Sequence, residues 1–209
     1  MKKLMKIQKN KGMTYVELIV VLSIFSIMTS IVLFNYGEFQ AKVDIRNLAS
    51  DIALKIVEAQ KSSLSGRFPP ATHTLSDPST WKPSYGLFFD VSTAIAKTSF
   101  IYFTDLDYTD PPPKQNGFFE GTACTDECLE KIDITKGNNI TRLDVFYQDS
   151  STASLNYLTV SFKRPDSSAV IKSSPPLNPN ISYAQITISS PSSSTATIKI
   201  YPSGRIQIN

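Results

Sequence analysis

The sequence predicts an α+β protein, in which a long N-terminal helix is followed by a domain built on an antiparallel β-sheet. Three observations lead to this fold class. Residues 18–37 contain no formal charge, apolar residues then recur at helical spacing to about residue 64, and short alternating or aromatic-rich runs follow Gly66. A period of 3.6 that gives way to a period of 2 is typical of a helix followed by strands.

The first segment, residues 1–12, is a basic leader that contains five lysines and no acid. The twenty uncharged residues 18–37 that follow form about 30 Å of helix, enough to cross a hydrocarbon core. We therefore predict a transmembrane helix over residues 13–37. Positively charged flanks remain in the cytoplasm, so the residues after Tyr36 are expected on the other side of the membrane.

Glu17 is the one carboxylate at the edge of this apolar run. An ionised side chain facing lipid costs about 2.5–3.5 kcal/mol at mid-bilayer and less near an interface. Such a group normally has a partner, so Glu17 is a candidate functional residue.

Residues 38–66 continue the helix as an amphipathic segment. Glu38 with Lys42, and Asp51 with Lys55, are spaced for ion pairs on the solvated side. Gly66 and the prolines at 69 and 70 are expected to end a helix that runs from about Thr14 to Leu64. One stripe of apolar residues predicts the face that packs on the domain: Ala41, Ile45, Leu48, Ile52, Ile56 and Ala59.

Residues 67–209 are predicted to form a β-rich ectodomain in which one antiparallel sheet packs on this stripe. A Pro-Ser-Gly turn within 198–208 predicts a terminal hairpin. Loops rich in Ser, Pro, Thr and Asn are expected at 68–84, 109–123, 164–182 and 190–195. Strands are expected at Tyr85–Val91, Ser99–Thr104, Leu143–Gln148, Tyr157–Lys163, Tyr183–Ser189 and Ala196–Tyr201.

The net charge does not indicate nucleic-acid binding by the ectodomain. The full chain carries +3, and the leader supplies five positive charges, so residues 13–209 carry −2. A clustered basic face, which a nucleic-acid-binding domain needs, is not indicated for the ectodomain.

The segment from Lys11 to Leu18 resembles the prepilin signal of type IV pilins and of type II secretion pseudopilins. It matches the pattern at Gly12, Met13, Thr14, Glu17 and Leu18, with Met where Phe is commoner. The resemblance implies cleavage by a prepilin peptidase between Gly12 and Met13, N-methylation of Met13, and Glu17 as the fifth mature residue. It also implies a pilin-like fold and a bacterial inner membrane location before assembly into a filament.

In such a filament, a carboxylate at Glu17 would neutralise the new terminal amine of a neighbouring subunit within an apolar core. The ectodomain itself resembles minor pseudopilins more loosely. This second resemblance rests on the runs Tyr85-Gly86-Leu87-Phe88-Phe89 and Tyr201-Pro202-Ser203-Gly204.

Chemically reactive residues are few in the ectodomain. Cys124 and Cys128 are expected to form a disulfide outside the cytoplasm, with two free thiols as the alternative. No third ligand for zinc lies nearby in the sequence. His73 is the single histidine, lies in a proline-flanked loop and is expected to be solvated.

One acidic run is a weak calcium candidate. Asp105, Asp107 and Asp110 follow an expected strand, but the run lacks the glycine and the distal Glu of a twelve-residue calcium loop. A solvated acidic turn is the favoured interpretation, and we expect no cofactor.

The sequence thus favours a structural subunit over an enzyme. The expected role is a minor pseudopilin of a type II secretion or type IV pilus machine, with the prepilin peptidase and other pilin subunits as partners. A competence-type or adhesive pilin that binds DNA or a surface is the alternative within the family. Outside the family, the alternatives are a signal-anchored binding module that never polymerises and an anchored enzyme.

Overall fold

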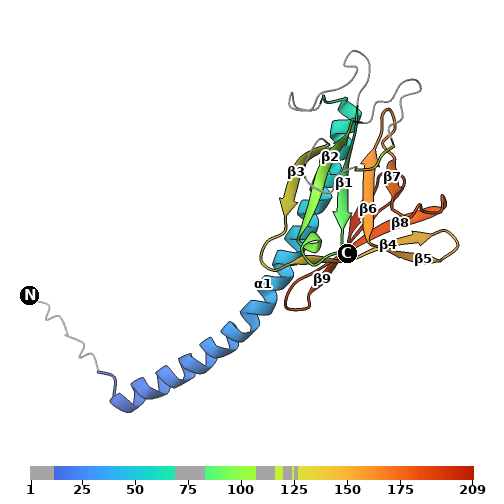
Figure 1. The fold of residues 1–209 in the computed structure, drawn as a ribbon. Helices are drawn as coiled ribbons and strands as arrows, with labels where there is room; N and C mark the ends of the chain where they lie inside the picture. Colours follow the sequence, from blue (N-terminus) through green and yellow to red (C-terminus); the bar gives the residue numbers. More distant parts are fainter. Residues whose placement is uncertain (1–11, 69–82, 107–115, 120–123, 125–126) are drawn as a thin grey trace, which may run out of the picture. The chain divides into compact units, whose positions relative to one another are not determined.

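The computed structural model describes residues 12–68, 83–106, 116–119, 124 and 127–209 (Figure 1). The chain divides into two units, Met1–Gln40 and Ala41–Asn209. The described residues form one long N-terminal α-helix and two antiparallel sheets, so the α+β prediction is confirmed.

Helix α1 runs from Tyr15 to Ser65, 51 residues that include no proline, and its ends lie within one residue of the prediction. Gly66 follows the helix with φ +61°. The Gly66 N–H donates to the Ser63 carbonyl at 3.0 Å, and the Arg67 N–H donates to the Ser62 carbonyl at 3.1 Å. These two bonds form a Schellman motif, which satisfies carbonyls of the last turn and explains why the helix ends at this glycine.

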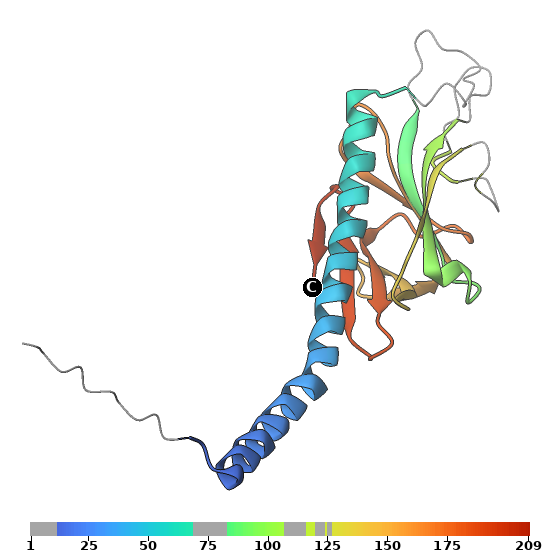
Figure 2. The same cartoon turned by 90° about the vertical axis from the view of Figure 1, so that its left-hand side faces the viewer.

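The second unit contains the residues of α1 after Gln40, which lie along the sheets (Figure 2). The predicted stripe is buried at Ile45, Ile52, Ile56 and Ala59, and half-buried at Ala41 and Leu48. The predicted ion pair of Lys55 with Asp51 is wrong. The Lys55 ammonium lies 3.1 Å from the Glu58 carboxylate and 2.6 Å from that of Glu130, because a partner on the packed sheet is within reach.

Within the described residues, ten strands form two five-stranded sheets, and all their pairings are antiparallel. A short 3₁₀ helix, η1 (Ala96–Thr98), lies between β1 and β2. The first sheet has the order β3 (Cys128–Asp133), β2 (Ser99–Asp105), β1 (Ser84–Asp90), β6 (Tyr157–Phe162) and β7 (Ala169–Lys172). The second has the order β10 (Ile206–Ile208), β9 (Thr195–Ile200), β8 (Ile181–Ser189), β4 (Asn139–Tyr147) and β5 (Thr152–Leu155).

The expectation of one sheet is therefore wrong, and β3, β5 and β7 were not predicted. β7 lies inside 164–182, which was expected to be a loop. All three strands lie at sheet edges. An edge strand pairs on one side only and is often short; β5 and β7 have four residues each, so their alternation signal is weak.

The two sheets and α1 share one hydrophobic core. Alternate residues point inward, as with Leu87 and Phe89 on β1 or Ile186 and Ile188 on β8, all fully buried. The Tyr85 hydroxyl also fixes the end of the helix, because it donates to the Arg67 carbonyl at 2.9 Å.

The terminal hairpin is confirmed, since β9 pairs with β10 around the Pro-Ser-Gly turn. In this turn the Gly204 N–H donates to the Tyr201 carbonyl at 2.8 Å, and Gly204 has φ +81°. The turn lies against the helix, because the Gln60 amide donates to the Ser167 carbonyl at 2.8 Å and contacts the Gly204 carbonyl at 3.5 Å. Gly204 therefore joins the hairpin, the helix and the loop before β7.

Candidate processing and assembly segment

The predicted cleavage junction lies just before α1. Gly12, Met13 and Thr14 are exposed and non-helical, and Met13 is 62 % exposed. A Cβ added at Gly12 would meet no atom within 4 Å. The peptide bond between Gly12 and Met13 is thus sterically open; the leader residues 1–11 lie outside the described part of the chain.

Glu17 lies in the first turn of α1, where it forms a reciprocal pair with Thr14. The Glu17 N–H donates to the Thr14 hydroxyl at 3.3 Å, and the Thr14 N–H approaches the Glu17 carboxylate at 3.5 Å. This is a capping box, which satisfies two backbone donors of the first turn. The negative charge is also favoured at a helix N-terminus. Glu17 therefore has a local role in the single chain, which the sequence analysis did not foresee.

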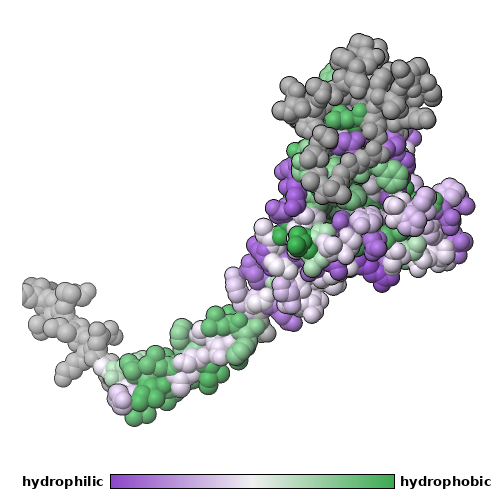
Figure 3. All heavy atoms as spheres, viewed as in Figure 1, coloured by the Kyte–Doolittle hydropathy of each residue, from purple (hydrophilic) through white to green (hydrophobic). Residues whose placement is uncertain are grey.

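The helix residues of the first unit present a largely apolar surface on the face that Figure 3 shows, where green spheres predominate. Large hydrophobic side chains from Leu18 to Phe39 are between 46 % and 85 % exposed. Two hydroxyls of this segment donate within the helix: Ser23 to the Val20 carbonyl and Thr29 to the Phe25 carbonyl, both at 2.8 Å. This arrangement suits a medium without water. In the described part of the chain, α1 is the one helix long and apolar enough to cross a membrane.

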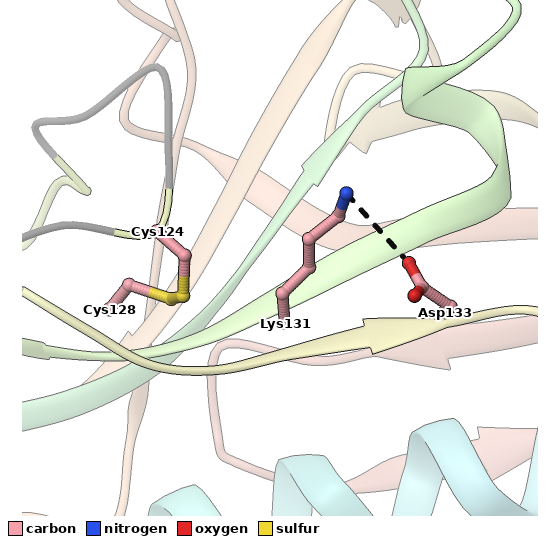
Figure 4. Close-up of a disulfide and its surroundings, with 4 residues drawn as sticks. All are labelled: Cys124, Cys128, Lys131 and Asp133. Carbon is pink, nitrogen blue, oxygen red and sulfur yellow. Dashed lines mark ion pairs between the residues drawn. A yellow bond between two sulfur atoms is a disulfide. The ribbon is translucent and has the colours of Figure 1, made fainter.

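The two cysteines are joined in the structure by a disulfide with 4.8 Å between the Cα atoms (Figure 4). Cys124 is exposed, whereas Cys128 is the buried first residue of β3. Lys131 and Asp133, further along β3, form a surface ion pair at 3.8 Å. The disulfide thus fixes the chain that leads into an edge strand.

The residues of the calcium candidate are only partly described. Asp105 is fully buried at the end of β2, where its carboxylate accepts hydrogen bonds from the Gly117 N–H at 2.7 Å and the Ser84 hydroxyl at 3.3 Å. Asp107, Asp110 and the single histidine, His73, lie outside the described residues. Among the residues that are described, no group of three or more His, Cys, Asp and Glu side chains is placed to hold a metal ion.

A cluster between α1 and the first sheet was missed by the sequence analysis. Lys55 bridges Glu58 and Glu130 and lies 5.2 Å from the centre of the Tyr102 ring. Burial lowers the pKa of Lys55, but the hydrogen bonds and charges of the two carboxylates outweigh it, so the pKa is raised. For Tyr102, by contrast, burial raises the pKa. The Tyr102 hydroxyl contacts the Ser62 hydroxyl at 3.2 Å. The cluster borders a cavity of about 400 Å³ and attaches the helix to the sheet.

Charge patterning could not have shown this cluster, because Glu130 is 75 residues away from Lys55 in the sequence. Comparison of the chain with protein-family models, with curated proteins and with solved structures finds no match.

Proposed function

We propose that this chain is a pilin-like structural subunit, of the minor-pseudopilin kind, of a bacterial type II secretion or type IV pilus machine. A prepilin peptidase would cut between Gly12 and Met13 and methylate the Met13 amine. The mature subunit would be held in the inner membrane with its ectodomain outside the cytoplasm. It would then enter a filament through its apolar helix.

One observation carries the proposal: an accessible Gly12–Met13 junction is followed immediately by a capped helix of exposed apolar residues with its acid at Glu17. An apolar surface of this size is buried either in lipid or against other helices. A filament that draws subunits from a membrane supplies both surroundings in turn.

The intact mass of the membrane-extracted protein tests the processing step. We expect the loss of residues 1–12 and the gain of one methyl group. Gly12→Leu should remain a precursor in cells with an active prepilin peptidase, because a bulky side chain blocks close approach to the backbone. A wild-type protein of full-length mass would favour the signal-anchored binding module instead.

The assembly role of Glu17 is tested with three variants, because the capping box separates its two roles. Glu17→Ala removes the cap and the charge, Glu17→Gln keeps a side chain suited to the capping box but removes the charge, and Thr14→Ala removes the cap alone. Breaking a buried ion pair costs about 3–5 kcal/mol, whereas losing a cap costs about 1 kcal/mol.

We therefore expect both Glu17 variants to fall out of the filament fraction while Thr14→Ala is incorporated. The measurement is co-purification of tagged subunits with sheared filaments or partner pseudopilins, with the membrane fraction as the control for expression and processing. Wild-type incorporation of Glu17→Gln would show that the residue is only a helix cap.

A further inference from the structure

A cavity of about 420 Å³ lies at the free edge of β7. Its walls are mostly apolar and come from four separate parts of the chain: Phe118, Ile171, Pro176, Leu177 and Pro202. Lys172 is the one charged residue among the lining residues. The volume lies within the range of about 300–1,000 Å³ that is usual for ligand-binding pockets.

One residue of β7 that lines this cavity, Ile171, has backbone hydrogen-bonding groups on the free edge of the strand. The Ala169 N–H points away from β6 and donates to the Pro202 carbonyl at 2.9 Å. Because the direction of backbone groups alternates along an antiparallel strand, the N–H and C=O of Ile171 point to the same side. Within the described ranges, no backbone hydrogen bond to Ile171 crosses that edge.

Lys172 adds a half-buried positive charge that has no anionic partner among the residues that the structure describes. Its ammonium donates to the Asn116 carbonyl and lies 4.9 Å from the centre of the Phe118 ring. None of the ion pairs among the described residues includes it. An ammonium carries three donors, and a charge between apolar walls is stabilised by an opposite charge.

We propose that this cavity and the strand edge beside it form a groove that binds an extended peptide of another protein. The peptide adds as a strand to β7 and places a carboxylate on Lys172. The free groups of Ile171 supply the strand pairing, the apolar walls take a side chain, and the ammonium selects an acid. Strand addition of this kind combines main-chain affinity with side-chain selectivity. The opposite edge of the same sheet differs, because β3 carries Glu130, Lys131 and Asp133, and charges at an edge discourage pairing.

The test uses the full-length chain in lipid nanodiscs and fluorescein-labelled octapeptides with an alternating Thr and Val frame. Three peptides are compared, which differ at one central position that is Asp, Asn or Lys. We expect fluorescence anisotropy to show binding of the Asp peptide, about tenfold weaker binding of the Asn peptide, and still weaker binding of the Lys peptide, as for loss of a charge-assisted hydrogen bond.

Two further peptides test strand addition directly. In one peptide the amides at odd-numbered positions are N-methylated, and in the other peptide the amides at even-numbered positions are N-methylated. Only one set of amides faces β7, so one peptide should lose binding and the other should keep it. Equal binding of the two would refute pairing with the strand edge.

Two protein variants test the charge. Lys172→Met keeps an apolar stem on Phe118 and should lower the affinity for the Asp peptide to that for the Asn peptide. Lys163→Met, which removes an exposed lysine after β6, should change nothing, and circular dichroism checks that both variants fold.

The proposal is overturned if no peptide binds at concentrations up to about 1 mM, the weak-binding limit. It is equally overturned if Lys172→Met binds the Asp peptide as wild type does. A dimer in sedimentation velocity that Lys172→Met dissolves would show that the occupant is a second copy of this chain. None of these outcomes depends on processing at Gly12, so the proposed function is tested separately.

Discussion

Substitution of Gly204 by Ala should strongly destabilise the ectodomain, because Gly204 lies where three segments meet. Its φ of +81° is disfavoured for residues that carry a Cβ, and an added Cβ would overlap the Ser167 carbonyl oxygen and lie 2.6 Å from the Gln60 amide nitrogen. The main chain of the loop at Ser167 would have to move away from the turn, and the Gln60 side chain would have to shift, to admit a methyl group.

The magnitude follows from three contributions. A residue other than glycine in a left-handed conformation costs about 1–3 kcal/mol. Overpacking costs about 1–3 kcal/mol, and losing the hydrogen bond from Gln60 to Ser167 costs about 1 kcal/mol. The loss is at least about 3 kcal/mol, which lowers the melting temperature of a domain of this size by about 6–12 °C.

The assay is thermal unfolding of the full-length protein in detergent, followed by near-UV circular dichroism. Gly37→Ala is the matched control, since a Cβ at this helical glycine would meet no atom within 4 Å; we expect it to be neutral or slightly stabilising. Gly204→Asn tolerates a positive φ better but keeps the Cβ, so it should recover only part of the loss. A wild-type melting temperature for Gly204→Ala would refute the reasoning.

Three further predictions follow from the packing and the titration. Gly86→Ala should cost about 1–3 kcal/mol in urea unfolding, because its Cβ would lie 2.6 Å from the Val160 carbonyl oxygen and 2.7 Å from the Phe103 ring. The pKa of Tyr85 is raised to about 12, chiefly by burial and secondarily by the charge of the Tyr102 phenol. A tyrosine in the unfolded chain has a pKa near 10. The stability due to neutral Tyr85 is therefore complete below pH 10 and is lost as the pH rises through 12, so Tyr85→Phe should flatten the decline in melting temperature over this range. Protein extracted with an alkylating agent present should keep Cys124 and Cys128 unmodified, and their replacement by Ser should cost less than the roughly 3 kcal/mol expected for a fifteen-residue loop; alkylation of both without prior reduction would contradict the disulfide.

The helix was predictable because its signals are local. The buried residues Ile45, Ile52 and Ile56 recur at spacings that only a helix places on one face, and Gly66 is a local stop signal. The strands that contribute several inward-facing residues were also predictable, because their alternation of apolar and polar residues is a local signal. Their assignment to two sheets was not predictable, since β6 follows β5 in sequence but pairs with β1 and β7.

Buried polar groups were the second failure of the sequence analysis, and Asp105 shows why. An aspartate before a run of acids and prolines resembles a solvated turn. In the structure, the Gly117 N–H reaches back over the sheet to its carboxylate, and the Gly117 carbonyl accepts a hydrogen bond from Ser161 at 3.2 Å. Asp105 therefore holds a connection against the first sheet, a role that depends on a partner twelve residues away.

The groove beside β7 combines both failures and explains why the sequence did not show it. Its strand is a four-residue edge strand in a segment rich in Ser and Pro, and its walls come from the 116–119 segment, the connection to β8 and the terminal hairpin turn. Lys172, taken alone, is an ordinary surface lysine. Only the fold shows that it lies over Phe118 next to an unpaired strand edge. A binding site assembled from separate loops carries no local period, so it can be inferred from the structure but not from the spacing of residues along the chain.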